Sequence, residues 1–258
     1  MKKILLPALF FSAVMQLSAQ TKQPPVPDDA PKWSIGLVSG VAIPIGPFAR
    51  VETPTGHFDT HPGPAAELSL AYRVAPSFSF VLAAAEQYNQ GGGISYFTES
   101  VGFSLPSRVY NDHNWKMTRL LGGGEWTVPL RKTGRLSLLF RGLLGAQKTK
   151  AADTYERLRY PLANPSPLGG YYVVSYPGPS FPWTFAYEAD AGIQWKMGKH
   201  LALTVNTGLG GAAPAKTITY LFGDMLIPER SAFPTTTVHI NAGLTYFFPY
   251  SKKISVAP

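Results

Sequence analysis

One loop of the sequence carries residues that could hold a metal ion. The stretch "GHFDTHPG" at 56–63 contains His57, Asp59 and His61, and imidazole and carboxylate groups are ligands that zinc accepts. Their every-second spacing would place all three side chains on one side only if the segment were extended, and no fourth ligand is evident. A solvated polar loop is the favoured interpretation, so we expect neither a metal nor a cofactor.

A second loop holds residue types that hydrolases use. They are Ser95, Ser100, Ser104, Asp112 and His113. Serines are common in loops, and no nucleophile motif surrounds these. We therefore expect no enzymatic activity, with a hydrolase site as an open alternative.

A third set of polar side chains lies inside otherwise apolar segments. Each member falls on the polar face of a segment in which polar and apolar residues alternate. The set comprises Glu67, Arg73, Arg119, Glu125, Arg141, Glu188, Asp190, Lys196, His239 and Asn241. Isolated burial of a charge is costly, but a set of mixed sign can pair. The pattern predicts an interior network of ion pairs.

Eight segments with a period of two would position these residues, and this period indicates β-strands. The segments are 33–44, 64–74, 77–88, 115–128, 135–147, 183–196, 200–212 and 235–248. Short connections (74–77, 129–134, 197–199) alternate with long ones (45–63, 89–114, 148–182, 213–234). This asymmetry is typical of an all-β, eight-stranded antiparallel up-and-down transmembrane barrel with short periplasmic turns and long extracellular loops.

Composition indicates which face of the strands meets lipid. Only 15% of the residues are charged, against about 25% in ordinary soluble domains. The bulky apolar side chains of eight strands would overfill a barrel of this size, whereas the opposite faces are rich in Gly, Ala, Ser and Thr. We therefore expect the apolar face outward and a closed polar lumen, with a soluble lipid-binding barrel as the reverse arrangement.

Large aromatic residues fall near the ends of the segments. They are Trp33, Tyr72, Phe78, Trp126, Trp183, Trp195, Tyr246 and Phe248. Aromatic girdles at the two bilayer interfaces would place them there. Two residues fit the pattern less well, because Glu86 and Lys116 fall on the lipid-facing parity. A β-bulge near the extracellular rim could reset the alternation, or these strands have left the bilayer by that point.

The N-terminus has the layout of a secretory signal peptide, which predicts export to the bacterial outer membrane. Lys2 and Lys3 precede an apolar run, and small residues end at Ala19. The predicted organisation is a signal peptide at 1–19, a Pro-rich periplasmic leader at 20–32, a barrel at 33–248 and a periplasmic tail at 249–258. Cysteine is absent, so disulfides do not contribute to stability.

This layout resembles the small eight-stranded outer-membrane barrels of the OmpA/OmpX type. More narrowly, it resembles the outer membrane protein beta-barrel domain family, which includes PorT-like proteins. The resemblance rests on the signal peptide, the Gly-rich first segment "WSIGLVSGVAIPIG" and the closing "NAGLTYFF". It implies a monomer in contact with outer-membrane lipid and lipopolysaccharide, and with the barrel-insertion machinery during biogenesis. The chain departs from the pattern because "PYSKKISVAP" follows Phe248.

The third long connection is the strongest candidate for binding an unknown protein or ligand. Its tyrosines are Tyr155, Tyr160, Tyr171, Tyr172 and Tyr176. Tyrosine offers contact area at a low entropy cost. The net charge of +8 forms no basic stripe, so we expect no nucleic acid. The predicted role is non-enzymatic binding, envelope maintenance or assistance to secretion; a narrow channel and an outer-membrane lipid hydrolase or acyltransferase stay open as alternatives.

Overall fold

The computed structural model describes most of the barrel and parts of its loops. The backbone is described for residues 31–53, 56–91, 98–100, 103–105, 108–111, 114–130, 134–151, 154–159, 171–176, 180–222, 225–232 and 234–249. Side chains are described for 31–49, 59–91, 114–130, 134–151, 180–214 and 234–249. The predicted signal peptide, nearly all of the leader and of the tail, and Tyr160 lie outside the described residues.

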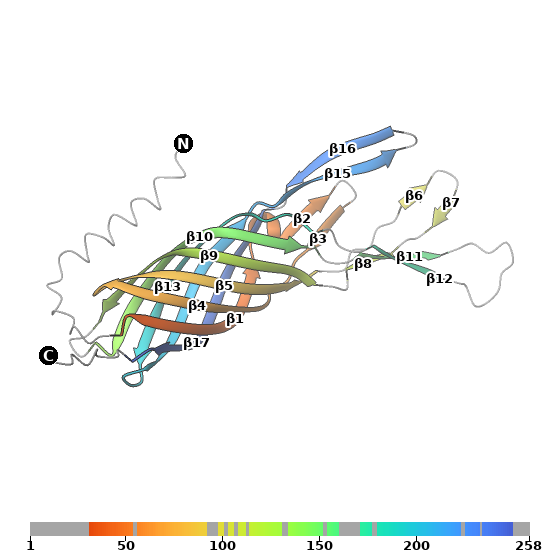
Figure 1. Ribbon diagram of the computed structural model, residues 1–258. Coiled ribbons are helices and arrows are strands. Elements are labelled where there is room, and N and C mark those ends of the chain that lie inside the picture. Colours follow the sequence, from red (N-terminus) through yellow and green to blue (C-terminus); the bar gives the residue numbers. More distant parts are fainter. Residues whose placement is uncertain are drawn as a thin grey trace, which may run out of the picture.

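Eight antiparallel strands close into a barrel (Figure 1). They are β1 (Trp33–Pro44), β4 (Gly63–Ala75), β5 (Phe78–Gln90), β9 (Asn114–Pro129), β10 (Leu136–Lys150), β13 (Thr184–Lys196), β14 (Leu201–Ala212) and β17 (Thr235–Phe247). Each strand pairs with its neighbour in this series, and β1 closes the ring by pairing with β17 from Ser34–Phe247 to Pro44–Thr237. The predicted eight-stranded up-and-down barrel is confirmed.

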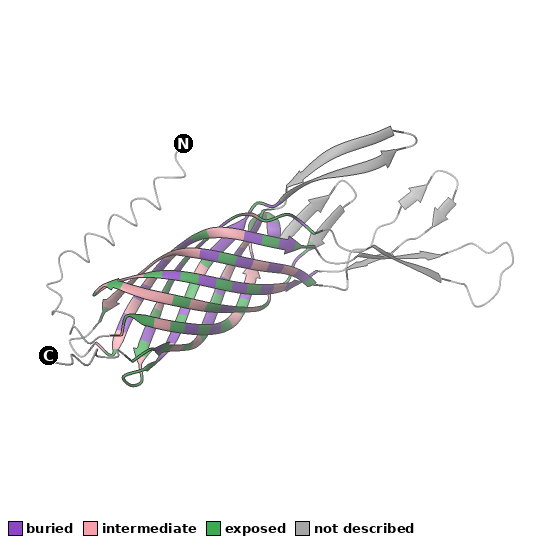
Figure 2. Cartoon of the chain, viewed as in Figure 1, coloured by how far each residue is buried: buried purple, intermediate pink, exposed green. Residues whose placement is uncertain are grey.

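The alternation in sequence becomes an alternation of burial along every barrel strand, because successive side chains of a strand point to opposite faces. On β13, Ala186, Glu188 and Asp190 are buried while Phe185 and Tyr187 are exposed. Figure 2 shows the same banding of buried and exposed residues around the barrel. The polar parity therefore faces the lumen and the apolar parity faces outward.

Short turns join the barrel strands at one end, which we call the turn end, and long connections join them at the other, the loop end. The turns lie between β4 and β5, β9 and β10, and β13 and β14. Gly134, in the turn after β9, has a φ of 61°, a conformation that glycine adopts without a steric cost. The N-terminal end of β1 and the C-terminal end of β17 both lie at the turn end, as expected for a barrel with an even number of strands.

The long connections contain elements that the period-two pattern did not predict. These are η1 (Gly46–Phe48), β2 (Arg50–Thr53), β3 (Gly56–Asp59), β6 (Thr98–Ser100), β7 (Phe103–Leu105), β8 (Arg108–Asn111), β11 (Thr154–Arg159), β12 (Tyr171–Tyr176), β15 (Ala215–Phe222) and β16 (Met225–Ala232). Strands β12, β11 and β8 form one three-stranded sheet, so the second and third long connections pair with each other. The other short strands form two-stranded ribbons.

The bulge considered near Glu86 and Lys116 is absent from the described β5–β9 pairing. The register runs without a shift from Phe78–Trp126 to Gln90–Asn114, and the described irregularity lies instead between Arg73 and Ala75. Glu86 and Lys116 lie on the outer face near the loop end, where their side chains pair at 3.2 Å. Their side chains point outward without a shift in the alternation, because both strands continue past the apolar part of the wall.

Candidate functional site: the filled lumen

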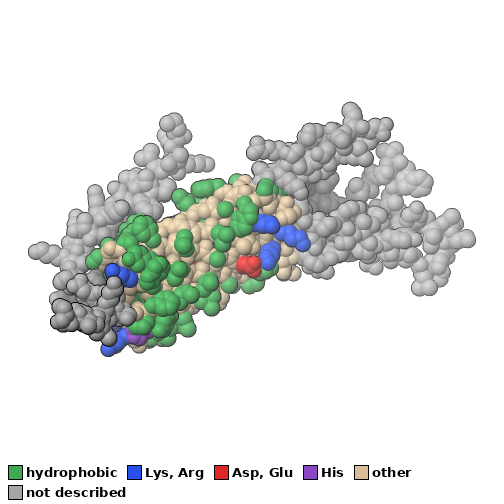
Figure 3. Space-filling view, viewed as in Figure 1, with side chains coloured by type: hydrophobic (Ala, Val, Ile, Leu, Met, Phe, Trp, Pro, Cys, Tyr) green, Lys and Arg blue, Asp and Glu red, His purple; other side chains and the backbone are tan. Residues whose placement is uncertain are grey.

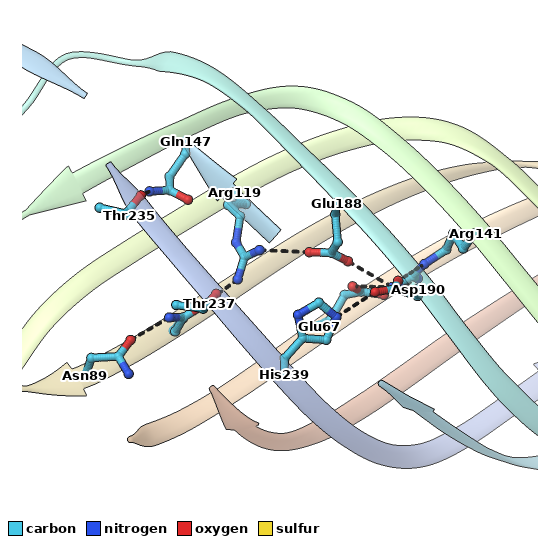
Figure 4. A network of polar contacts seen from close by, with 11 residues as sticks. Glu67, Asn89, Arg119, Arg141, Gln147, Glu188, Asp190, Thr235, Thr237 and His239 are labelled. Atoms are coloured by element: carbon cyan, nitrogen blue, oxygen red, sulfur yellow. Dashed lines mark hydrogen bonds and ion pairs between the residues drawn. The ribbon is translucent and has the colours of Figure 1, made fainter. Parts of the chain in front are cut away.

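Arg141 on β10 is the centre of the polar network inside the barrel (Figure 4). Its Nη2 donates to Glu67 Oε2 at 2.8 Å and to Glu188 Oε1 at 3.0 Å, and its Nε donates to Asp190 Oδ2 at 2.6 Å. A bidentate fork to Glu67 is completed by Nη1. One guanidinium thus holds carboxylates from β4 and β13, and such charge-assisted bonds are the strongest hydrogen bonds in proteins.

The network continues from Arg141 on both sides. Arg119 Nη1 donates to Glu188 Oε2 at 2.8 Å, so Glu188 bridges the two arginines. On the other side His239 Nε2 lies 2.6 Å from Asp190 Oδ1. A Cβ at Gly208 would overlap Asp190 Oδ1 and lie 2.7 Å from His239 Nε2. Glycine at this position therefore leaves room for the Asp–His pair.

Amides and hydroxyls fill the lumen between this network and the loop end. Arg119 Nη2 donates to Gln87, whose own amide donates to Asn89. Asn89 Nδ2 in turn donates to the backbone oxygen of Ala42 at 3.0 Å. Across the lumen, Gln147 Nε2 donates to Thr235 Oγ1 at 2.7 Å. Most of these side chains are buried and bonded to each other, so polar side chains pack continuously in the part of the lumen toward the loop end.

An apolar cluster lies at the loop end, above the amide layer. Phe48, Trp115, Met117, Ala151 and Phe181 pack together and are all buried. The Phe48 and Trp115 rings meet edge to face with centroids 5.6 Å apart. Trp115 and Met117 belong to the inward parity of β9, so the network has an apolar cap on its loop side.

A further apolar patch lies on one wall of the lumen, and the sequence reasoning missed it. Its members are Val81, Ala83, Leu121, Leu143, Ala186 and Ala212. The signal was present in segment 77–88, where the inward parity carries Val81, Ala83 and Ala85 while the outward parity is apolar as well. The interior is therefore polar in its centre and apolar along part of β5, β9, β10, β13 and β14.

The turn end of the lumen holds a cavity of about 280 Å³. Three of the predicted lumen residues, Arg73, Glu125 and Lys196, line it and are half-buried. None of the three forms an ion pair within 4.0 Å with another residue whose side chain is described. The structure thus places all ten predicted polar residues in the lumen, but joins only Glu67, Arg119, Arg141, Glu188, Asp190 and His239 by ion pairs.

Asn241 is the last of the ten predicted lumen residues. It is buried, and its Oδ1 has no protein partner.

Three of the lumen residues have the chemistry of a metal site. Ligand atoms of Glu188, Asp190 and His239 lie within 4.8 Å of one another and all three residues are buried. Arg119 and Arg141 already bond the two carboxylates, and adjacent guanidinium groups repel a cation. The donor set is thus committed to ion pairs, and the geometry does not favour a metal. Of the loop residues considered as ligands, His57 lies outside the described side chains and Asp59 is exposed.

The predicted aromatic residues are unequally divided between the ends of the barrel. Trp33, Tyr72, Phe78, Trp126, Trp195, Tyr246 and Phe248 lie at the turn end, and Trp183 alone among the eight lies at the loop end. Contacts join several of them, with ring centroids 4.7 Å apart in Trp33–Tyr72 and 4.8 Å apart in Phe78–Trp126. Loop tyrosines Tyr155, Tyr171, Tyr172 and Tyr176 lie on β11 and β12, whose side chains are outside the described set.

Comparison with known proteins gives similarity in structure only. No family model and no curated protein matches the chain. Neisserial surface protein A (NspA) is 9% identical with a TM-score of 0.43, covering 84% of this chain and 97% of its own. OprG from Pseudomonas aeruginosa is 10% identical with a TM-score of 0.45, covering 86% and 97%. Ail, the attachment invasion locus protein of Yersinia pestis, is 15% identical with a TM-score of 0.37, covering 83% and 99%.

These are small barrels of the outer membrane, but identities and TM-scores this low carry no information about activity, ligand or partner. The narrower PorT-like family named from the sequence stays a prediction. The architecture described above rests on the strand pairing of this chain itself.

Proposed function

We propose that the chain is an integral outer-membrane barrel, non-conducting and non-enzymatic, that acts through what it binds at its ends. The observation that carries this proposal is that the barrel wall is apolar outside and polar inside, the reverse of a soluble barrel. Apolar side chains face outward on every barrel strand, and the ion-pair network is inside. Leu82, Phe185 and Leu37 have exposed fractions of 67%, 64% and 60%. Soluble proteins rarely expose contiguous apolar surface on this scale.

The apolar surface has the dimensions and borders that a bilayer requires. A strand of 12 residues such as β1 spans roughly 40 Å along its axis and, tilted by about 45°, rises close to the roughly 25 Å of an outer-membrane apolar band. Figure 3 shows hydrophobic side chains along the barrel with charged ones toward its ends. Lys116 and Lys148 at the loop end would meet lipopolysaccharide phosphates. No helix among the described residues is long and apolar enough to cross a membrane.

Membrane fractionation tests the location. We expect the mature chain to fractionate with the outer membrane, to require detergent for extraction and to migrate faster on gels before heating than after. Recovery in the soluble periplasmic fraction without detergent would instead support a soluble lipid-binding barrel.

The packing of the lumen supports a closed barrel. The apolar cluster at the loop end, the amide layer and the Arg119–Glu188–Arg141 bridge occupy the lumen one after another, and eight strands enclose little more than side chains. We expect no conductance steps when the purified protein is reconstituted in planar bilayers. Regular single-channel steps that disappear when the protein is omitted would favour the narrow channel instead.

The lumen offers no arrangement for nucleophilic catalysis among the residues whose side chains are described. His239 pairs with Asp190, but its Nδ1 has no protein partner and thus no hydroxyl to activate. Nucleophilic catalysis requires the nucleophile within hydrogen-bond reach of its base. An outer-membrane hydrolase or acyltransferase would therefore need a site in the loops, and we expect unchanged lipid A when the protein is overexpressed.

We propose the loop end as the surface that binds an external partner. Strands β8 and β11, from two different connections, pair with each other, and Tyr110 is the register partner of Tyr155. Linking two loops through backbone hydrogen bonds reduces the entropy that binding would otherwise cost. A photo-crosslinking residue at Tyr172 is expected to capture a specific partner on intact cells, whereas the same residue at Lys199 in a turn is not. Equal capture from both positions would contradict the assignment.

A further inference from the structure

The cavity at the turn end of the lumen is distinct from the ion-paired network above it. Its lining includes Pro76 and Gly134 from the turns and Pro129 from the end of β9, so it reaches the end of the barrel. Its inner wall includes Arg141 and Asp190, so it extends inward as far as the network. A volume of about 280 Å³ is far more than the roughly 10–15 Å³ that a cavity needs to hold one water molecule.

The charges in this cavity are unbalanced in favour of cations. Arg73 and Lys196 come from β4 and β13, and their positive charges repel each other. Lys32 and Arg141 bring the cations of the lining to four. The Glu125 carboxylate attracts the Arg73 guanidinium electrostatically, but it forms no ion pair within 4.0 Å among the described residues. Glu67 and Asp190 also line the cavity and both bond to Arg141, so the lining holds four cations against three carboxylates.

The contacts of the two cations leave their hydrogen-bonding groups free for a ligand. The Lys196 ammonium lies over the Phe247 ring, 5.8 Å from its centroid, a contact that leaves its N–H donors free. No side-chain hydrogen bond of Arg73 or Lys196 exists among the described residues. A guanidinium and an ammonium that line one cavity can both donate charge-assisted hydrogen bonds to an oxyanion.

Neutral polar groups complete the lining. Ser69, Ser79, Thr127 and Ser137 contribute hydroxyls. Asn206 also lines the cavity; it is only 7% exposed and its Oδ1 has no hydrogen-bond partner. A buried acceptor without a partner is destabilising unless a water or a ligand hydroxyl donates to it. The cavity therefore offers cationic donors for an anion and one acceptor for a hydroxyl.

We propose that this cavity binds a small, soluble oxyanion that carries a hydroxyl, of the chemical class of monohydrogen phosphate and small phosphate monoesters. Arg73 and Lys196 hold the anionic oxygens and Asn206 accepts from the hydroxyl. A lipid headgroup is not the source, because the cavity lies inside the ring of strands whereas lipid would meet the outer face. The site goes beyond the binding role proposed for the loop end.

Isothermal titration calorimetry of the mature chain in detergent, with inorganic phosphate as the probe, tests the proposal. We expect saturable binding of one phosphate per chain. Replacing either cation by a neutral residue of similar length, Arg73→Gln or Lys196→Gln, should weaken binding about tenfold or more, because each removes a charge-assisted hydrogen bond. The conservative variant Arg73→Lys should retain most of the affinity.

Lys199→Gln is the matched control, because Lys199 is an exposed turn lysine outside the cavity lining. It should bind phosphate as the unaltered chain does. All variants should keep the heat-dependent gel shift, which shows that the barrel has folded. Absence of saturable heat at millimolar phosphate, or equal weakening by Lys199→Gln and Lys196→Gln, would overturn the proposal.

Discussion

The two halves of the lumen are built on the same eight strands but filled in opposite ways. Toward the loop end, Asn89 and Thr149 have no exposed surface and bond to neighbouring groups. Toward the turn end, Arg73 and Lys196 are half-buried beside a cavity and make no ion pair among the described side chains. The closed half is filled by groups that bond to each other, and the open half leaves polar groups available to a ligand.

The difference follows from where opposite charges meet across the barrel. Arg141 is the register partner of both Asp190 on β13 and Glu125 on β9, yet it bonds Asp190 and reaches across to Glu67 and Glu188. This choice satisfies three carboxylates with one guanidinium. It leaves Glu125 in the open half without an ion pair within 4.0 Å among the described residues, in a lining that also holds Arg73, Lys196 and Lys32.

Removing the centre of the closed half should have the largest effect. Arg141→Met would leave Glu67 buried without its guanidinium partner and remove one partner each from Glu188 and Asp190, and breaking a buried ion pair on one side costs about 3–5 kcal/mol. The midpoint of urea unfolding in detergent should fall accordingly. Arg135→Met is the control, because Arg135 is exposed at a turn. Equal stability of the two variants would show that the network contributes nothing.

A charge placed on the outer face tests the contrast between the lumen and the wall. Leu82 lies near the middle of β5 and faces outward. If lipid surrounds it, Leu82→Arg should reduce the free energy of unfolding in bilayers by about 2–4 kcal/mol.

Leu130→Arg makes the same change at an exposed residue just after β9, and it should cost much less. A Leu82→Arg variant within about 0.5 kcal/mol of the unaltered chain would indicate that water covers this face.

The amide layer should show a smaller effect than either. Gln147→Leu removes the donor to Thr235 and Thr149 but leaves no charge unpaired, so we expect a loss of about 1–3 kcal/mol in the free energy of unfolding. Gln90→Leu is the matched change at the exposed end of β5 and should be nearly neutral. If Gln147→Leu leaves the free energy of unfolding unchanged, the amide layer fills space and its hydrogen bonds do not contribute to stability.

The sequence predicted the wall of this barrel better than its contents. Alternation depends on each strand alone, so the inward parity of Glu188, Asp190 and Lys196 was readable from one segment. Partner choice depends on how eight strands are staggered around the ring, which a single chain's pattern does not contain. The structure places the predicted polar set on the inner face, but nothing in the sequence distinguished Arg141, which bonds three carboxylates, from Arg73, which forms no ion pair among the described residues.

The loop strands show a second limit. Strands β8 and β11 have four and six residues and derive their conformation from pairing across two connections, so neither has enough alternation to be recognised alone. Continuation of β9 to Asn114 likewise explains Lys116 on the outer face without a bulge. In each case, pairing beyond the segment decided what local periodicity could not.

The smallest expected effect lies in the open half and concerns binding more than stability. Glu125→Gln removes the carboxylate that opposes an anion beside Arg73, while its half-buried position keeps the stability change small. Affinity for phosphate should rise by about three- to tenfold, because one repulsive charge at close range is lost. Glu86→Gln, an exposed change on the outer face near the loop end, should leave phosphate binding as it is. Weaker binding by the Glu125→Gln variant would mean that Glu125 positions the cations and does not oppose the ligand, since a repulsive carboxylate cannot strengthen binding of an anion.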